Sequence, residues 1–256
     1  MGKIAFSIGP FHVYWYGMIL ALAVVAAIVS GIFQARLRKQ SPEKILDIAL
    51  FGVPIAIICA RGHYIMTNWV LYAEQPGEMV SLWHGGLSFT GAAFGLLLTI
   101  VLYSKWKNLN LWCWADILTP GLALAQAVGS LANFINQEGF GAPSNLAWSI
   151  YIDFNCRPAG YEQFDFFQPL FLYESLSSLV FFLLATALAF YQVKSGKGRT
   201  GILFLVYFIF LASIRFILEG LELNRILFIG QLTADQVISV ITVGVCAYLL
   251  AAKIKK

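Results

Sequence analysis

Residues 12–34 read HVYWYGMILALAVVAAIVSGIFQ and contain no Lys, Arg, Asp or Glu. A helix of about 20 apolar residues crosses about 30 Å of hydrocarbon, so this stretch is long enough to span a membrane. The sequence as a whole predicts an all-α integral membrane protein with seven transmembrane helices. The six further apolar stretches are 45–66, 86–103, 112–132, 167–191, 201–219 and 232–252.

The composition favours a single transmembrane domain over residues 1–256. Hydrophobic residues make up 59% of the chain and charged residues 12%, which leaves too little polar surface for a soluble domain. The connection 133–166 mixes amides, carboxylates and prolines, and we expect it to form a small head between spans four and five. The connection 67–85, with Trp69, Tyr72 and Trp83, suits an interfacial segment.

Basic residues in the connections predict the orientation, because short loops rich in Lys and Arg remain in the cytoplasm. We expect the N-terminus and the head outside and the C-terminus in the cytoplasm. The net charge of +4 follows from this topology, and the basic residues form no single stripe, so nucleic acid is not an expected partner. The outer connections hold only Lys3, Arg157 and Arg225. The cytoplasmic connections hold Arg36, Arg38, Lys39, Lys44, Lys105, Lys107, Lys194, Lys197, Arg199, Lys253, Lys255 and Lys256.

Cysteine and histidine give no sign of a metal site or a disulfide framework. Of the 4 cysteines, Cys156 alone lies in an outer connection, and no CxxC pair occurs. With only 3 histidines, the ligand spacing of a structural zinc site is missing. We therefore expect neither a metal nor another cofactor.

Polar side chains within the spans fall at one depth, the outer third of the membrane. Polar groups in hydrocarbon are costly and usually functional. Because these residues come from spans that run alternately up and down, their common depth predicts one site. They are Tyr16, Arg61, His63, Thr90, Asn133, Asn136, Glu138, Glu174, Arg215, Glu219, Asp235 and Gln236.

The densest group is the run GSLANFINQEGFG at residues 129–141. Asn133 and Asn136 are three residues apart, so on one helical turn they face the same way. The glycines that follow allow the backbone to approach a ligand closely. The alternative is that these polar groups only cap a helix end at the membrane interface.

A second group is the pair Arg215 and Glu219 in the sixth span. Their i, i+4 spacing places both side chains on one helix face, and a guanidinium suits the recognition of phosphate. The alternative is an internal ion pair that only neutralises both charges. The two interpretations are compatible, because a carboxylate can orient an arginine that still offers free donors.

Five motifs together resemble the bacterial prolipoprotein diacylglyceryl transferases over essentially the whole chain. They are the run from Asn133 to Gly141, Gly85-Gly86-Leu87-Ser88, Tyr14-Trp15-Tyr16-Gly17, Leu172-Tyr173-Glu174 and Arg215 with Glu219. The resemblance implies transfer of the diacylglyceryl group of phosphatidylglycerol to the lipobox cysteine of a lipoprotein precursor, with release of glycerol phosphate. It also implies a multi-pass protein of the bacterial cytoplasmic membrane whose site faces the outer leaflet.

The resemblance also suggests roles for individual residues. Arg215 would bind the phosphate and Glu219 would hold Arg215. Arg61 is either a second phosphate ligand or a residue that only extends to the interface. His63 is a candidate base for the thiol, or an interfacial side chain bonded to backbone; His84 lies at the same height. The expected substrate-binding residues are Tyr16, Gly86, Thr90, Ser130, Asn133, Asn136, Glu138, Gly141, Tyr173, Glu174 and Gln236.

The chain departs from the family pattern at several site positions. Ser130 stands where the family has an arginine, and Thr90 where it commonly has histidine or tyrosine. Leu211 replaces a tyrosine, Gln168 a histidine and Ala132 a glycine. Two classes of function therefore remain: a transferase with the usual or a changed acceptor or donor, and a membrane protein that binds lipid or lipopeptide without catalysis. A transporter is disfavoured because the cytoplasmic halves of the spans lack a continuing polar path.

Overall fold

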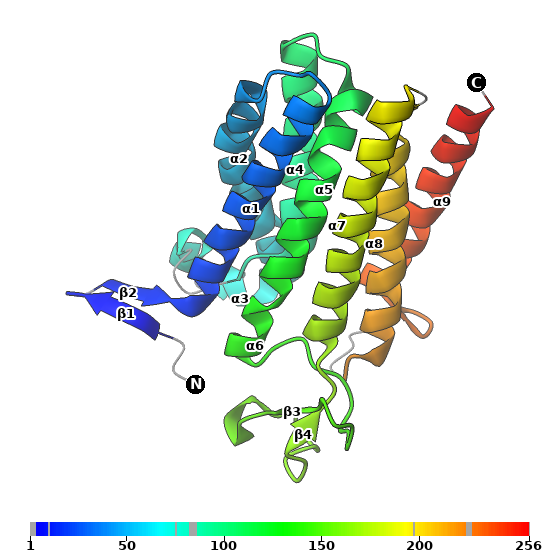
Figure 1. Ribbon diagram of the computed structural model, residues 1–256. Coiled ribbons are helices and arrows are strands. Elements are labelled where there is room, and N and C mark those ends of the chain that lie inside the picture. Colours follow the sequence, from blue (N-terminus) through cyan, green and yellow to red (C-terminus); the bar gives the residue numbers. More distant parts are fainter. Residues whose placement is uncertain are drawn as a thin grey trace.

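The computed structural model describes residues 4–9, 11–74, 76–81, 86–196, 198–223 and 227–255. Within these ranges 7 helices are long and apolar enough to cross a membrane, which confirms the predicted spans. The helices run side by side in one bundle (Figure 1). Their bounds are α1 Trp15–Leu37, α2 Glu43–Thr67, α4 Phe89–Trp106, α5 Leu111–Ser130, α7 Leu170–Ser195, α8 Ile202–Leu221 and α9 Ala234–Ile254.

Short helices and strands occupy one end of the bundle, which we call the head end, opposite the C-terminus (Figure 1). The strands form antiparallel pairs that the sequence analysis did not predict. Strands this short leave no recognisable alternation in the sequence. The elements are β1 Ile4–Ile8, β2 Phe11–Tyr14, α3 Trp69–Glu74, η1 Pro76–Val80, α6 Ala132–Asn136, β3 Ile150–Tyr151, η3 Phe154–Cys156, β4 Phe166–Phe167, β5 Leu227–Ile229 and β6 Leu232–Thr233.

Two segments have bounds in the structure that differ from the predicted ones. The first span begins at Trp15 rather than at residue 12, because Phe11–Tyr14 pairs with Ile4–Ile8 as a hairpin. The predicted interfacial segment 67–85 contains α3 and η1, and Trp69 is 58% exposed whereas Tyr72 is buried. Trp83 and His84 lie outside the described residues.

Glycines permit the close approach of α2 and α4, the helix pair that supports Thr90. A Cβ at Gly95 would lie 2.8 Å from Ala56 Cα, and one at Gly91 would clash with the carbonyl oxygen of Cys59. Small residues four apart let helix backbones meet in this way within a membrane. The contact therefore requires glycine at both positions.

Gly91→Ala is expected to destabilise the fold by about 1–3 kcal/mol, the usual cost of overpacking a closely packed contact. Thermal unfolding in detergent measures the effect. Gly62→Ala on α2 is the matched control, because nothing lies within 4 Å of a Cβ there. Equal midpoints for the two variants would contradict the assigned close contact.

Arg157 organises the head segment 133–166. Its guanidinium donates to the backbone oxygens of Ile152 at 2.9 Å and Glu162 at 2.7 Å, and pairs with the Asp165 carboxylate at 2.7 Å. The segment joins the bundle through Gly141, whose N–H donates to Gln168 O at 2.9 Å. The head is thus a folded unit seated at the ends of the spans.

Asp116 fixes the opposite end of the bundle, where the basic connections lie. Its buried carboxylate accepts hydrogen bonds from the backbone N–H groups of Gly201 at 2.6 Å and Phe204 at 2.9 Å. These groups begin α8, so an anion of α5 caps the helix that carries Arg215. The Arg38 guanidinium lies 3.9 Å from the same carboxylate. This anchor sets the position of α8 in the bundle.

Candidate functional site

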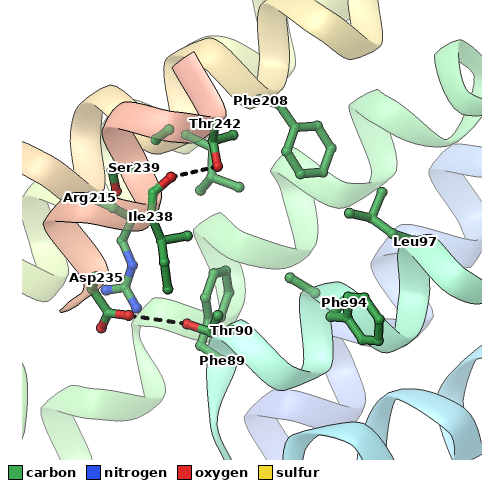
Figure 2. Close-up of a pocket in the computed structure, with 13 residues that line it drawn as sticks. Phe89, Thr90, Phe94, Leu97, Phe208, Arg215, Asp235, Ile238, Ser239 and Thr242 are labelled. Atoms are coloured by element: carbon green, nitrogen blue, oxygen red, sulfur yellow. Dashed lines mark hydrogen bonds between the residues drawn. The ribbon is translucent and has the colours of Figure 1, made fainter. Parts of the chain in front are cut away.

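A cavity of about 300 Å³ lies between α4, α8 and α9 (Figure 2). Its polar groups gather at the head end, where Thr90 is the second residue of α4 and Asp235 the second residue of α9. Most of the remaining lining is apolar. The described lining residues are Phe89, Thr90, Ala93, Phe94, Leu97, Phe208, Leu211, Ala212, Arg215, Asp235, Ile238, Ser239 and Thr242.

Three polar residues of three different helices meet at this end of the cavity. Thr90 Oγ1 donates to Asp235 Oδ1 at 3.4 Å. The Arg215 guanidinium carbon lies 4.9 Å from the centroid of the Phe89 ring, a cation–π distance. Figure 2 shows Arg215 and Asp235 next to each other on neighbouring helices. Residues far apart in the sequence thus form a charged end on an otherwise apolar cavity.

A buried polar chain supports Arg215 from behind. Glu174 Oε1 of α7 lies 3.7 Å from Arg215 Nη1, and Glu174 accepts a hydrogen bond from Gln126 Nε2 of α5 at 3.1 Å. Gln126 Oε1 accepts in turn from the Tyr207 hydroxyl at 3.0 Å. Arg215 forms no ion pair with Glu219 among the described residues. Its carboxylate partner is therefore Glu174 rather than the expected Glu219.

Gln126 and Tyr207 were not among the predicted site residues. Gln126 is an amide in an apolar span, and this was the sequence feature that could have identified it as a site residue. It lies one turn deeper than the head run and outside the predicted common depth. Ser130, one turn closer to the head, is buried and donates to Gln126 O at 2.9 Å. The head run and Arg215 are thus connected through Gln126 and Glu174.

Four carboxylates and the Arg215 guanidinium, all among the described residues, gather around the end of α8. Glu222 follows α8 and keeps contact with solvent, yet partial burial raises its pKa, and the Glu219 and Asp235 carboxylates raise it further. The Arg215 guanidinium lowers the pKa of Glu222 and Glu174 adds a small upward effect. Each of these groups therefore lies within electrostatic range of Glu222, and the carboxylates among them outnumber the guanidinium.

The head run lies beside the cavity rather than in it. Asn133 and Asn136 share α6, as the spacing predicted, and Gln137 ends the turn with a φ of 55°. Gly139 contacts Asn133, since a Cβ there would lie 3.4 Å from Asn133 Nδ2. Gly141 bridges to Glu222 at the end of α8. A φ of +66° thus accounts for Gly139, and the close approach of the Leu221 carbonyl oxygen, 3.0 Å from the position of a Cβ, accounts for Gly141.

Two tyrosines predicted for the site also lie around the head run. The Tyr173 hydroxyl accepts a hydrogen bond from Trp148 Nε1 of the head at 2.9 Å. Tyr16 and Glu138 are close enough to interact electrostatically. Of the predicted residues, the described cavity lining contains Thr90 and Arg215, with Asp235 from the same depth. Glu174 joins them through its contact with Arg215.

Arg61 holds a connection and does not line the cavity. The buried guanidinium donates to the backbone oxygens of Met79 at 3.0 Å and Gly86 at 3.0 Å, and also to Glu78 O and Ser81 O. The guanidinium carbon Cζ of Arg61 lies 5.1 Å from the centroid of the Tyr72 ring. Backbone carbonyls of the connection between α2 and α4 thus use donors of Arg61, and its role as a phosphate ligand stays a prediction.

Three further predicted residues, Gly86, Gln236 and His63, are not in the described cavity lining. Gly86 adopts a φ of +77°, and a Cβ there would lie 2.5 Å from Arg61 Nη1. Gln236 closes a capping box with Thr233 and donates to Phe216 O at 3.2 Å. His63 is not in the described cavity lining, and its Nδ1 is buried without a hydrogen-bond partner. The role of His63 as the base for the thiol stays a prediction.

Metal ligands do not converge in the part of the chain that the structure describes. No group of three or more His, Cys, Asp or Glu side chains is arranged to hold an ion there. The site therefore consists of an apolar cavity, a guanidinium at its head end and surrounding carboxylates and amides. Such a cavity accommodates an amphipathic ligand, with its polar end at Arg215 and its apolar part between α4, α8 and α9.

Comparison with known proteins decides the family. A family model described as prolipoprotein diacylglyceryl transferase matches residues 3–252. The chain belongs to this family. The resemblance of the five motifs is thereby confirmed, and the membrane-spanning fold is that of a family of transferases.

Bacterial relatives in this family are similar over nearly the full length of both chains. A protein of Trichormus variabilis is 36% identical over 95% of this chain and 87% of its own. One of Listeria innocua is 35% identical over 97% and 90%, respectively. One of Bacillus licheniformis is 34% identical over 98% and 92%. All three are named phosphatidylglycerol–prolipoprotein diacylglyceryl transferase.

Proposed function

We propose that this protein transfers the diacylglyceryl group of phosphatidylglycerol to the cysteine thiol of a prolipoprotein signal peptide. The single observation that carries the proposal is the position of Arg215 at the charged end of an apolar cavity between α4, α8 and α9. A phospholipid matches this cavity, because it carries an anionic phosphate at one end and apolar acyl chains at the other. Membership of the transferase family supplies the reaction class.

The geometry supports a displacement at the diacylglyceryl carbon that carries the phosphate. The thiolate forms a carbon–sulfur bond to the diacylglyceryl carbon, the carbon–oxygen bond to the phosphate breaks, and the phosphomonoester leaves with the electron pair. With phosphatidylglycerol the leaving group is glycerol phosphate. Donors aimed at the leaving group stabilise the charge that develops on it. Arg215, oriented by Glu174, is the described cavity residue that carries such donors.

We also propose that the cavity opens towards the outer leaflet of the bacterial cytoplasmic membrane, with the N-terminus outside and the C-terminus in the cytoplasm. The support is the charge distribution: Arg36, Lys105 and Lys194 lie in the last turns of helices at the end opposite the head. Positive loops remain in the cytoplasm. The head segment 133–166 is then extracytoplasmic within a single transmembrane domain.

A thiol reagent that cannot cross the bilayer is expected to label Cys156 of the head in intact cells. In a Cys156→Ser background, Ser195→Cys at the end of α7 is expected to stay unlabelled until the membrane is permeabilised. The reason is that Cys156 lies in the head and Ser195 at the opposite end of the bundle. Mass spectrometry of the labelled peptides measures both. Labelling of Ser195→Cys in sealed cells would contradict the proposed orientation.

Transfer itself is tested with purified protein, phosphatidylglycerol vesicles and a peptide that carries a lipobox cysteine. The expected result is a diacylglyceryl thioether on the peptide, detected by mass spectrometry, together with glycerol phosphate. A peptide with serine in place of the cysteine is the control, because its hydroxyl is a far weaker nucleophile. Absence of the thioether with folded protein would contradict the proposed activity.

A second candidate is a protein of this fold that binds lipid or lipopeptide without catalysis. The observation that favours it is Ser130, which donates to its own helix at a position where the family pattern has an arginine. The same assay separates the two candidates. Retention of phosphatidylglycerol by the purified protein without thioether formation would identify a binding protein.

A further inference from the structure

We propose that Asp235 is the catalytic base that takes the proton from the acceptor cysteine thiol. The inference rests on the proposed function, because it assigns one further residue to the same reaction. The thiolate rather than the thiol is the nucleophile, and a free cysteine, with a pKa of about 8.5, is mostly protonated at neutral pH. A group that accepts this proton beside the reacting carbon therefore accelerates the transfer.

Asp235 carries the basic group among the cavity-lining residues that the structure describes. Arg215 is the other charged side chain of that lining, and a guanidinium stays protonated and cannot act as a base. The polar side chains that remain there are the hydroxyls of Thr90, Ser239 and Thr242, which are far weaker bases than a carboxylate. Aspartate and glutamate do act as general bases in enzymes.

The Asp235 carboxylate has one oriented oxygen and one available oxygen. Thr90 Oγ1 donates to Oδ1 at 3.4 Å, whereas Oδ2 accepts no hydrogen bond from any described residue. Asp235 is exposed at the start of α9. Oδ2 is therefore positioned to accept a proton from a thiol that arrives at the head end of the cavity.

Glu174, the other carboxylate next to Arg215, is already engaged. It is buried, lies 3.7 Å from Arg215 Nη1 and accepts a hydrogen bond from Gln126 Nε2 at 3.1 Å. A proton on Glu174 would remove the ion pair that orients Arg215. Neither Glu174 nor His63 belongs to the described cavity lining, so Asp235 is the better placed base.

Asp235 and Arg215 lie next to each other at the head end of the cavity, on α9 and α8 (Figure 2). They nevertheless form no ion pair within 4.0 Å in the part of the chain described by the structure. A displacement places the nucleophile and the leaving group on opposite sides of the reacting carbon. It therefore requires a base and a cation that are close together but do not neutralise each other.

In the proposed step Asp235 Oδ2 takes the thiol proton while the sulfur forms its bond to the diacylglyceryl carbon of phosphatidylglycerol. The carbon–oxygen bond to the phosphate breaks, and glycerol phosphate leaves with the electron pair beside Arg215. The protonated Asp235 then gives its proton to the departing phosphate or to water, which restores the base.

Two acceptor peptides that differ in one atom test the inference. One lipobox peptide carries cysteine and the other selenocysteine, both kept reduced, and vesicles supply phosphatidylglycerol. A selenol is a stronger acid than a thiol and is ionised at neutral pH, so it needs no base. Mass spectrometry measures the single-turnover rates of thioether and selenoether formation.

Asp235→Asn is expected to lower the rate with the cysteine peptide by about 100-fold, within the usual range of a general base. With the selenocysteine peptide we expect the variant to stay within about threefold of the wild-type rate, because no proton transfer remains to be catalysed. Asp235→Glu keeps a carboxylate and should recover part of the loss.

Asp153→Asn is the matched control. It removes the same charge from an exposed carboxylate of the head, outside the described cavity lining, and should leave both rates unchanged. Asp235→Asn should also retain as much phosphatidylglycerol as the wild type and unfold at the same temperature, since a base for the acceptor does not hold the donor lipid.

A near-normal rate of Asp235→Asn with the cysteine peptide overturns the inference. An equal loss with both peptides overturns it as well, because Asp235 would then act in binding or folding. A loss confined to the cysteine peptide in His63→Gln, but not in Asp235→Asn, would assign the base to His63. These three outcomes leave the proposed function standing, whereas absence of transfer by the folded wild type to either peptide would reject both.

Discussion

Arg215→Ala is expected to lower diacylglyceryl transfer by about 100-fold or more, the usual effect of removing a donor that stabilises a developing anion. Arg215 is the described cavity residue that offers a cation to the phosphate. Its removal also leaves the buried Glu174 without its ion-pair partner, which costs stability. Initial rates of thioether formation and thermal unfolding are measured on the same preparations.

Arg215→Lys separates the two effects. Lysine keeps the positive charge near Glu174, so the fold should be retained, but it lacks the planar fork of a guanidinium. We expect this variant to unfold near the wild-type temperature and to stay well below the wild-type rate. If the wild-type protein shows no transfer, the amount of phospholipid that each variant retains is measured instead of the transfer rate. Near-normal transfer or retention by Arg215→Ala would remove Arg215 from the site.

Ser130→Arg is expected to raise the transfer rate by about tenfold, less than the roughly 100-fold or more that a preorganised donor contributes, because position 130 lies outside the described cavity lining. Position 130 lies one turn from Gln126, on the same face of α5, and Gln126 binds Glu174. A guanidinium there would add positive charge to a region where carboxylates prevail. Single-turnover rates with phosphatidylglycerol measure the effect.

Ser130→Gln is the control for side-chain size, because it fills similar space without the charge. A buried position accepts a long side chain at some cost, so both variants should show a comparable loss of thermal stability. The rate should rise in the arginine variant alone. An unchanged rate with an intact fold would show that the site works without a cation at position 130.

The bilayer explains why the spans could be predicted from the sequence. A chain that crosses hydrocarbon must satisfy its backbone groups within each segment, so a helix is the expected form and the length of each apolar stretch is constrained. The strand pair β1–β2 escaped prediction because it lies where the first apolar stretch begins. Contacts outside the spans depend on neighbours and leave no long pattern.

In the site, too, the sequence predicted the residue types, whereas the tertiary structure determined their contacts. Arg61 and Arg215 are both arginines near the head end of an apolar helix, and the family resemblance suggested related roles for them. Tertiary contacts separate them: Arg61 binds carbonyls of a connection, whereas Arg215 faces the cavity beside Asp235. The guanidinium of an arginine binds those acceptors that the folded chain places next to it.

The sequence by itself determined the number of spans, the family motifs and the common depth of the polar residues, because hydrophobic length and residue type act locally. The tertiary structure alone decided that Glu174 pairs with Arg215 and that Gln126 and Tyr207 support this pair. These contacts join α5, α7 and α8 across long stretches of sequence. Their partners are chosen by helix packing, which no spacing within one helix can reveal.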